Sequence, residues 1–472
     1  MTKIPTAAFW RQIICLVPVY LNVLVMGSGL GWLPNAMYLL TKGQEVRATS
    51  TQCAWIASCS IFGRLVFAIP AGILADKYGR KEITICVAFL HFSAWLGLSM
   101  SSSIVTIYIG RFVIGLAEVL INSTALISIG EIASAENRGR LTTLYHICAS
   151  FGGILSSLIS LSFSSYSTLS RGIAALSFIS LLSMFWASET PSFLVSSSKL
   201  NEAKNNLRYI RRGYKEQVIN NEFEKIKNYI QDEKARKKTL SWIKFLKLKS
   251  IRKPLLVGIL ANFFSKSTGV MLMRNYITLL IPSNKFVARR YYPLVIQTLL
   301  LLVSTNATLY IDKIPRRTLI LVGSLILAGI NGVCGLSSYL MAGIQNEDDV
   351  FRWVFIVTNI LAILCYTISV QPVTTVLKSE LYPQSVKGFC VSLGSLSQSL
   401  STVLSYQMYH FTENLSILYV MYIVFSINSV LLYLIMHFFM PEGLGTSLTD
   451  LQMTFKEPTL QDGHSVEKNS QT

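Results

Sequence analysis

Long apolar blocks constrain this chain more than any other feature of its sequence. Each block runs for about 20 residues or more without regular alternation of polar and apolar residues. A helix rises 1.5 Å per residue, so about 20 apolar residues cross a hydrocarbon core of roughly 30 Å. The sequence predicts twelve such spans, at 12–33, 53–75, 83–103, 105–130, 141–165, 169–187, 254–281, 291–311, 318–342, 351–377, 388–411 and 415–440.

The composition supports the same class of protein. Of the 472 residues, 51% are hydrophobic and 14% are charged, and the mean hydropathy is +0.48. Soluble domains carry about a quarter charged residues, and membrane strands would need an apolar residue at every second position. We therefore expect an all-α membrane protein with twelve transmembrane helices.

The net charge of +18 first suggests a nucleic acid as partner, but the distribution of the basic residues favours a membrane. If both termini lie in the cytosol, 30 Lys and Arg residues fall in cytosolic segments and 7 in outer loops. The positive-inside rule then predicts cytosolic termini. We expect a multi-pass protein that contacts lipid and no nucleic acid.

Charged motifs at the ends of the spans occur twice, about 240 to 250 residues apart. Residues 76–81 return as 312–317, residues 131–138 as 380–387, and residues 189–191 as 441–442. A membrane chain that repeats its boundary charges is typical of a transporter with two parallel repeats and a substrate site between them. We therefore predict two six-helix repeats.

One long connection separates the two predicted repeats. The repeats cover 1–187 and 254–440, the connection is 188–253, and a tail follows at 441–472, with a disordered end. Apolar residues recur in the connection at 3- and 4-residue spacing: Leu200, Ala203, Leu207 and Ile210, then Ile219, Phe223, Ile226 and Ile230. This spacing predicts short amphipathic helices that pack under the bundle or touch anionic lipid. A regulatory partner site is the alternative.

Seven segments, in order, resemble the signature motifs of the sugar porter family of the major facilitator superfamily. They are 63–81, 110–111, 130–141, 188–194, 312–317, 379–388 and 441–451. Trp32, Pro34 and residues 54–58 are similar to the insect facilitated trehalose transporter branch. The resemblance implies the major facilitator fold, a cytosolic helical linker domain, a central cavity for a mono- or disaccharide, and the plasma membrane as location.

The boundary charges predict a cytosolic network of salt bridges. Such bridges can form in one conformation and break in another, and so bias alternating access. The alternative is that they only fasten loops. Gly72 is expected to let neighbouring helices approach closely. The predicted gating network comprises Asp76, Arg80, Arg111, Glu131, Arg138, Glu189, Asp312, Arg316, Arg317, Glu380, Lys387 and Glu442.

The cavity positions depart from the family pattern. Family members usually have Gln-Gln-x-x-Gly-x-Asn in span seven, where amides exchange hydrogen bonds with sugar hydroxyls, and residues 265–271 here read Ser-Lys-Ser-Thr-Gly-Val-Met. Span ten lacks the usual aromatic platform, and His146 and Gln398 replace a glutamine and an asparagine. The predicted cavity residues are His146, Ser265, Lys266, Met271, Tyr276, Thr375 and Gln398.

Lys266 is the most unusual of these residues because it lies roughly 18 Å into its span. A lysine at this depth costs about 2.5–3.5 kcal/mol on insertion scales, so we expect it to face water or a counter-charge, with Glu118 as a candidate partner. One interpretation is an anionic substrate, or a sugar held by fewer amides. The other is a lysine without a role in substrate binding. Arg274, further along the same span, is expected to snorkel to the outer interface.

Two titratable residues within spans are candidates for a proton relay. Glu118 and His146 are of the acid–base type that forms such relays in membranes. Proton-coupled members of the family, however, usually carry an acidic residue in span one, where this chain has Asn22 and no carboxylate. The sequence therefore favours uniport.

Enzymatic chemistry is not expected. The sequence has no recognisable nucleophile–base pair, phosphate loop or metal cluster, and its eight cysteines are scattered singly. We expect neither a cofactor nor a metal, and no obligate protein partner. The leading prediction is facilitative transport of a sugar such as trehalose or a hexose. A carrier of a different, anionic solute and a non-transporting solute sensor remain as alternatives.

Overall fold

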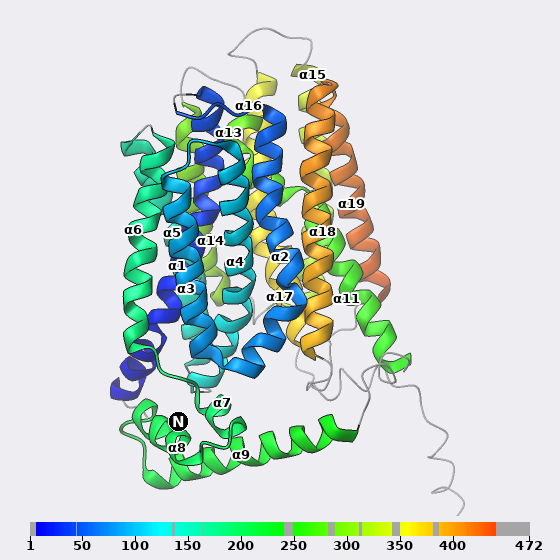
Figure 1. Cartoon of the computed structure of the whole chain (residues 1–472). Helices are drawn as coiled ribbons and strands as arrows, with labels where there is room; N and C mark the ends of the chain where they lie inside the picture. The colour runs from blue at the N-terminus through cyan, green and yellow to red at the C-terminus, as the bar shows by residue number, and fades with distance from the viewer. Residues whose placement is uncertain are drawn as a thin grey trace, which may run out of the picture.

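The computed structural model describes residues 6–43, 45–134, 137–163, 165–239, 249–281, 288–310, 314–341, 350–380 and 387–439. In this part of the chain every regular element is a helix, and each of the twelve predicted spans contains one. Figure 1 shows the long helices side by side in one bundle, with three helices of the connection across one end. The predicted all-α fold with twelve transmembrane helices is confirmed.

The first half of the bundle consists of six long helices followed by a single 3₁₀ turn. They are α1 (Thr6–Lys42), α2 (Ser50–Tyr78), α3 (Arg80–Ser99), α4 (Ile104–Ile132), α5 (Arg138–Ser162), α6 (Tyr166–Ser183) and η1 (Met184–Trp186). Helix α1 packs against α5, α2 against α4, and α3 against α4 and α6. Thr49 precedes α2 and caps it with a capping box. The Thr49 hydroxyl accepts from the backbone N–H of Gln52, and the Gln52 side chain accepts from the backbone N–H of Thr49.

The described part of the connection forms three helices. They are α7 (Pro191–Ser196), α8 (Leu200–Ile210) and α9 (Glu216–Thr239). Two of them, α8 and α9, coincide with the two predicted amphipathic runs of the connection. Ala203, Leu207, Ile219 and Phe223 are buried together in a small core of their own, whereas Leu200 remains 40% exposed. We call the end of the bundle beside these helices the linker end and the opposite end the far end (Figure 1).

The second half has more interrupted helices. They are α11 (Lys249–Ser267), α12 (Val270–Asn275), α13 (Ile277–Leu280), η2 (Arg289–Tyr291), α14 (Tyr292–Tyr310), α15 (Arg316–Met341), α16 (Val350–Cys365), the π-helical turn η3 (Tyr366–Val370), α17 (Gln371–Glu380), α18 (Lys387–Asn414) and α19 (Leu418–Phe439). Helix α15 packs against α19 and α16, and α11 packs against α18.

The seventh span differs from the prediction, because 254–281 is not one continuous helix. Gly269 ends α11 with a φ of 81°, in the left-handed region that glycine adopts without strain. A Cβ there would also collide with the ring of Phe425. The chain resumes as α12 and then α13, so the seventh span is divided within the bundle.

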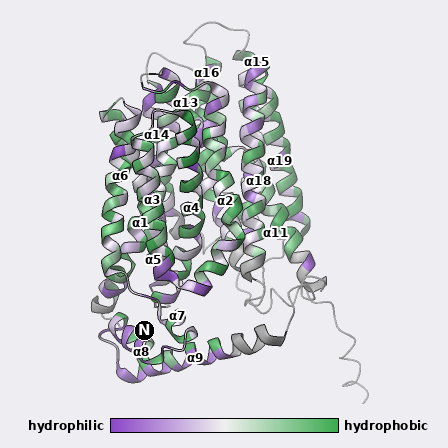
Figure 2. Ribbon diagram, in the orientation of Figure 1, coloured by the Kyte–Doolittle hydropathy of each residue, from purple (hydrophilic) through white to green (hydrophobic). Residues whose placement is uncertain are grey.

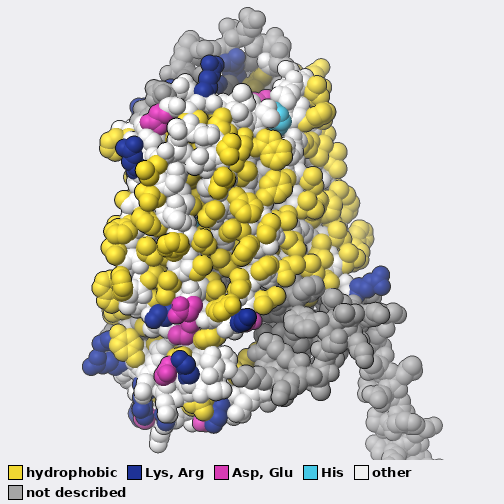
Figure 3. Space-filling model, viewed as in Figure 1, with side chains coloured by type: hydrophobic (Ala, Val, Ile, Leu, Met, Phe, Trp, Pro, Cys, Tyr) yellow, Lys and Arg dark blue, Asp and Glu magenta, His cyan; other side chains and the backbone are white. Residues whose placement is uncertain are grey.

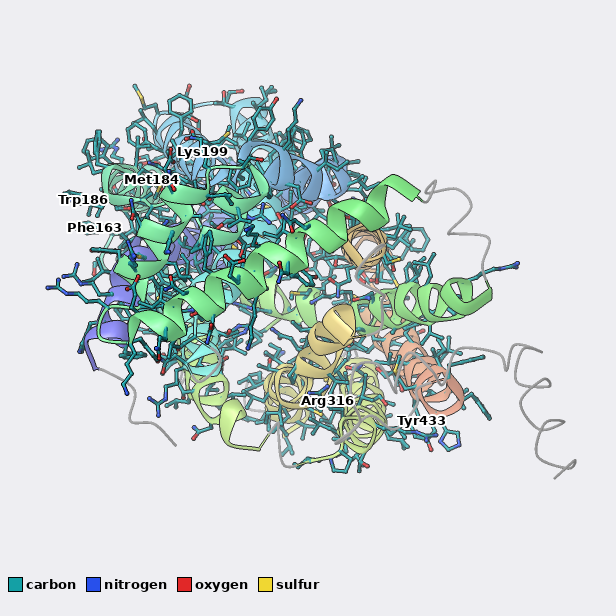
Figure 4. The ribbon with its side chains drawn as sticks, turned by 90° about the horizontal axis from the view of Figure 1, so that it is seen from below. Phe163, Met184, Trp186, Lys199, Arg316 and Tyr433 are labelled. Carbon is teal, nitrogen blue, oxygen red and sulfur yellow. The ribbon has the colours of Figure 1, made fainter. Side chains whose placement is uncertain are left out.

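The surface of the bundle suits contact with lipid. Nine helices of the described residues are long and apolar enough to cross a membrane. Figure 2 shows the hydrophobic residues concentrated along the bundle and the hydrophilic ones on the linker helices, and Figure 3 shows a broad hydrophobic surface between charged ends. Trp186, at the edge of the bundle in Figure 4, is 76% exposed. Tryptophan is common at this position because its ring suits the membrane interface.

Glycines allow close contact between helices in the first half, but Gly72 is not one of them. No atom lies within 4 Å of the place where a Cβ of Gly72 would stand. A Cβ at Gly115 on α4, in contrast, would collide with the backbone of Ser60 on α2, and one at Gly31 would collide with Gly153 on α5. The close approach expected at Gly72 therefore occurs at these other positions.

Candidate functional site

The two halves of the bundle meet along three pairs of surfaces. Helix α2 packs against α18, α5 against α14, and α1 against α12 and α13. Since the seventh span is broken at this contact, its short helices lie directly against α1. The interface between the halves is therefore the region in which the sequence places a substrate.

Hydrogen bonds join the halves at the far end. Thr278 of α13 donates from Oγ1 to the carbonyl oxygen of Pro34 in α1, at 2.8 Å. Gln407 of α18 donates from Nε2 to Oγ of Ser58 in α2, at 3.4 Å. Both bonds lie in the portion of these helices that is remote from the linker.

A third bond between the halves lies at the tip of the far end. Ser50, the first residue of α2, donates its hydroxyl to the carboxylate of Glu413 at the end of α18. Tyr409 donates to the other oxygen of the same carboxylate, at 3.1 Å. These three bonds join the halves at the far end and close the interface there.

Lys266 contacts an aromatic ring inside the second half. Its Nζ lies 5.3 Å from the ring centroid of Tyr366, within the range of a cation–π interaction. The hydroxyl of Tyr366 lies 3.1 Å from Oγ of the preceding residue, Ser265. Tyr366 starts the π-helical turn η3, a geometry frequent at functional sites.

Sequence reasoning missed Tyr366. The sequence predicts that span ten has lost its aromatic platform around residues 371–375, yet Tyr366 supplies a ring five residues before Gln371. An aromatic residue shortly before Gln371-Pro372 is the signal that could have identified it.

The other cavity residues predicted in the second half lie in different surroundings. Gln398 donates from Nε2 to Oδ1 of Asn262, at 2.8 Å, and so joins α18 to α11. Thr375 is exposed and donates to the carbonyl oxygen of Gln371 on its own helix. Met271 is half-buried in α12. Ser265, Lys266 and Gln398 therefore lie around one portion of α11, and Thr375 lies nearer the linker end.

Tyr276 is fully buried in an aromatic cluster. Its ring centroid lies 5.3 Å from that of Tyr406 and 4.9 Å from that of Tyr409. Tyr406 also accepts a hydrogen bond from Asn275. The hydroxyl of Tyr276 has no partner among the described atoms, so this residue belongs to the closed far end rather than to an open surface.

His146 of α5 faces the interface between the halves. Its side chain is exposed, and so are Phe151 and Leu158 on the same helix. At about 100° per residue, His146 lies about 140° around the helix from Phe151, but within about 20° of Gly153. A Cβ at Gly153 would press on Gln297 of α14. His146 therefore lies on the side that faces the second half, away from the exposed apolar side.

Glu118 pairs with an arginine rather than with Lys266 or His146. Its Oε2 lies 3.5 Å from Nε of Arg64 on α2, and its side chain is only 4% exposed. Among the described contacts none joins Glu118 to His146. The structure therefore does not bring the two members of the predicted proton relay together.

Four of the predicted network residues meet at the linker end of the first half. Arg80 binds Oδ1 of Asp76 at 3.2 Å and Oε1 of Glu131 at 3.1 Å. Glu189 accepts from the backbone N–H groups of Arg80 and Lys81, at 3.1 and 3.2 Å. These are the first residues of α3, where free N–H groups and the helix dipole favour a carboxylate. The cluster joins α2, α3 and α4 to the start of the connection.

Arg111 is not part of this network, which corrects the prediction. It lies 20 residues before Glu131 on α4, a distance of about 30 Å. Its guanidinium donates to Oγ of Ser60 at 2.8 Å and to the carbonyl oxygen of Ile56 at 3.4 Å. It also lies 5.2 Å from the ring of Trp32. Arg111 therefore fastens α4 to α2 and α1 near the far end.

The described part of the second half includes only two of the predicted network residues with their side chains. Arg317 donates to the carbonyl oxygen of His437 at 2.7 Å and ties α15 to the end of α19. Arg316 is half-buried at the linker end, on the opposite side of α9 from Lys199 in Figure 4. Five further residues of the predicted network lie outside the described residues or side chains: Arg138, Asp312, Glu380, Lys387 and Glu442.

Arg274 also differs from the prediction. It does not extend to the outer interface but donates from Nη2 to Oε1 of Gln297 on α14, at 3.0 Å, and its Nε is buried. Because α12 is separated from α11 by the break at Gly269, Arg274 points into the bundle. Within the described residues no three His, Cys, Asp or Glu side chains gather as a metal site.

Comparisons with known proteins agree with this architecture. A family model described as "Sugar (and other) transporter" matches residues 22–455. The glucose transporter GlcP of Staphylococcus epidermidis is 24% identical over 446 residues, which are 93% of this chain and 96% of that protein. The facilitated trehalose transporter Tret1 of Bombyx mori is 23% identical over 447 residues, which are 94% of this chain and 86% of that one.

Solved structures share the fold. The inward-open conformation of the xylose transporter XylE from E. coli superposes with a TM-score of 0.76 at 16% identity, over 95% of this chain and all of that one. The proton:xylose symporter XylE bound to 6-bromo-6-deoxy-D-glucose gives a TM-score of 0.75 at 17% identity, over 96% and 99% of the two chains. This likeness identifies the fold as that of the major facilitator superfamily.

Proposed function

The chain belongs to the sugar (and other) transporter family, and we propose that it carries a sugar across a membrane by facilitated diffusion in an alternating-access cycle. The proposed substrates are trehalose or a hexose, which relatives of similar sequence are named for. The substrate is bound by hydrogen bonds between the halves, and no covalent chemistry takes place.

The closed far end is the observation that carries the proposal. Three bonds, Pro34–Thr278, Ser58–Gln407 and Ser50–Glu413, join the halves there. Each is a single hydrogen bond: two join neutral groups, and the third joins the Ser50 hydroxyl to the Glu413 carboxylate. Each bond has a net worth of about 1 kcal/mol, so none of them alone prevents the far end from opening. An interface that is closed at one end by weak bonds suits a protein that alternates between two states.

Uniport is supported by the surroundings of the intramembrane acid. Span one contains Asn22, which donates to the carbonyl oxygen of Pro18, and no carboxylate. Glu118 is already paired with Arg64. This pair joins α2 to α4 inside the first half, which gives Glu118 a structural role.

We place the linker end in the cytosol of a cell whose plasma membrane holds the protein. The excess of basic residues in the segments at this end supports that orientation. In this scheme residues 1–187 and 254–440 move against each other as two bodies, and residues 188–253 form a cytosolic domain.

The charge cluster at the linker end is proposed to stabilise one of the two states. Arg80 with its partners Asp76 and Glu131 makes the first half rigid there. Replacement of Glu131 by Ala is expected to change the balance between states and the transport rate. Unchanged kinetics, together with unchanged labelling of Cys53 at the closed far end, would remove the gating role.

Counterflow uptake of labelled trehalose and glucose into proteoliposomes, with and without a pH gradient, tests the proposal. Saturable uptake that ignores the gradient is expected. Uptake that follows the gradient would replace uniport by proton coupling. Glu118 and His146 would then be the candidate proton carriers. No uptake of either sugar by demonstrably folded protein would favour a solute sensor or a different substrate.

A further inference from the structure

The interior of the bundle has a large excess of positive charge. Glu118 is the single carboxylate in the middle of any span, because every other Asp and Glu lies between spans or at their ends. Four cations lie at interior positions of the helices: Arg64, Arg111, Lys266 and Arg274. Charges inside a membrane protein are costly unless they are paired or face water. Glu118 can pair with one of the four cations, so the charge of the other three must be stabilised in another way.

Glu118 can neutralise only one of them, and the structure shows which one. Arg64 lies 3.5 Å from Glu118, so this pair is accounted for. Lys266, on α11 of the opposite half, has no carboxylate within ion-pair distance among the described residues, and Glu118 is not available to it. The candidate pairing of Lys266 with Glu118 is therefore wrong.

Two of the remaining cations are held by neutral partners. Arg111 is almost fully buried and uses Ser60, the carbonyl oxygen of Ile56 and the ring of Trp32. Arg274 uses the side chain oxygen of Gln297. Both lie toward the closed far end and fasten helices to each other. Their guanidinium groups therefore hold helices together without an added ligand.

Lys266 differs because the structure does not enclose it in this way. Its side chain is only half-buried, and among the described residues the interaction recorded for its ammonium group is with the face of Tyr366, at 5.3 Å. A ring face attracts a cation but does not cancel its charge. An ammonium group in this position keeps its donors available to a solute.

Neutral hydrogen-bonding groups lie near Lys266 along α11, where Ser265 precedes it and Asn262 stands about one helical turn earlier. Oγ of Ser265 and the hydroxyl of Tyr366 lie 3.1 Å apart, and the amides of Asn262 and Gln398 are 2.8 Å apart. Hydroxyl and amide groups can donate to and accept from sugar hydroxyls. One fixed cation next to such groups matches a solute that combines several hydroxyls with one negative charge.

We propose that the physiological substrate is an acidic sugar, a polyhydroxylated solute with one carboxylate, and that the carboxylate binds Lys266. This inference rests on the proposed transport of sugars between the two halves, but it makes an acidic sugar the preferred substrate in place of the neutral trehalose or hexose. A charge-assisted hydrogen bond between the ammonium group and the carboxylate removes the excess charge at this position. Neutral sugars would leave Lys266 unpaired and bind more weakly.

The test compares uptake of labelled glucuronate and labelled glucose into proteoliposomes. Wild type is expected to prefer glucuronate, and an inside-positive potassium diffusion potential, set with valinomycin, is expected to increase glucuronate uptake but not glucose uptake.

Lys266→Gln is expected to reduce glucuronate uptake by about tenfold or more and to keep or raise glucose uptake. Lys266→Arg retains the charge and is expected to retain most glucuronate uptake. Lys199→Gln, on the exposed surface of the linker, is the matched control and is expected to behave as wild type.

The outcomes separate this inference from the proposed function. Glucose uptake by wild type without any glucuronate uptake, or equal loss of both sugars in Lys266→Gln with a wild-type melting temperature, would overturn the acidic-sugar assignment and leave sugar transport intact. Glucuronate uptake that is unaffected by Lys266→Gln would also overturn it. No uptake of either sugar by folded wild-type protein would overturn both.

Discussion

Arg211 of the connection donates a hydrogen bond of 2.8 Å from Nη1 to the carbonyl oxygen of Ile132, the last residue of α4. The last carbonyls of a helix have no partner within the helix, and Arg211 supplies one from a helix 79 residues away. Its remaining nitrogens bind Glu222 of α9, with a shortest distance of 2.8 Å. A single buried side chain thus joins α4, α8 and α9.

Replacing Arg211 with Ala is expected to release the connection from the first half. The carbonyl oxygen of Ile132 would lose its partner, at a cost of about 1–3 kcal/mol. Hydrogen exchange of α8 and α9 is expected to accelerate, and limited proteolysis is expected to cut within them. Arg212→Ala, at the exposed neighbouring residue, is the control. Equal protection in the two variants would contradict a clamp at Arg211.

Replacing Thr278 with Val is expected to weaken the closed far end. The change removes the bond to Pro34, worth about 1 kcal/mol, and so shifts the ratio of the two states about fivefold toward the state that is open there. Cys53, fully buried at the start of α2, is a native reporter. Its labelling by an impermeant maleimide, followed by mass spectrometry of its peptide, is expected to become faster.

The control for that experiment is Thr298→Val. Thr298 is an exposed residue of α14 that donates to Leu294 on its own helix, so it has no role between the halves. If both variants label Cys53 at the wild-type rate, the bond between Thr278 and Pro34 does not hold the far end closed.

Replacing Gly115 with Ala is expected to destabilise the first half. The added methyl group would collide with the backbone of Ser60, and the overpacking costs about 1–3 kcal/mol. A clear fall of the melting temperature in detergent is the expected result. Gly72→Ala should melt like wild type, since nothing lies within 4 Å of the new methyl group. Similar melting of the two variants would argue against close packing of α2 on α4.

The ionisation of Glu45 is expected to make the stability of the first turn of α6 depend on pH. Partial burial tends to raise the pKa of its carboxyl, but hydrogen bonds from Ser165 and Ser167 outweigh this effect and lower the pKa below its usual value. A carboxyl with a lowered pKa contributes its stabilisation above the pKa of the unfolded chain, about 4.3. That contribution is lost as the pH falls through the folded value.

Glu45→Gln is therefore expected to reduce amide protection in the first turn of α6 at neutral pH. The difference from wild type is expected to shrink as the pH falls below about 4. Protection factors from hydrogen exchange measure it, with Glu202→Gln, on the exposed surface of the linker, as the control. A difference that stays constant down to the lowest pH would mean that the charge of Glu45 does not matter.

Features that depend on spacing along the chain could be predicted from the sequence. The twelve spans follow from the length of the apolar blocks, and the meeting of Asp76, Arg80 and Glu131 follows from motifs that lie at span ends on the same side of the membrane. Arg111 does not follow this pattern. It stands near the start of its span, so a motif that is short in sequence does not bring it to the end where Glu131 lies.

Contacts between distant segments could not be predicted in this way. The pairing of Arg64 with Glu118 depends on how α2 is rotated against α4, and hydropathy carries no information on rotation. The bond of Arg211 to Ile132 joins a soluble helix to the end of a membrane helix. The break at Gly269 was hidden because a single glycine in an apolar block is also compatible with a continuous helix.

The attachment of the connection has a mechanical consequence. Arg211 holds α8 and the start of α9 to the first half, while the 24 residues of α9 extend across the linker end as a rod of about 36 Å. A rotation of the first half about the attachment at Arg211 therefore moves the end of α9 by about 0.6 Å for each degree. The position of this end follows the rotation of the first half. A spectroscopic probe attached there would therefore report that rotation without a label in the cavity.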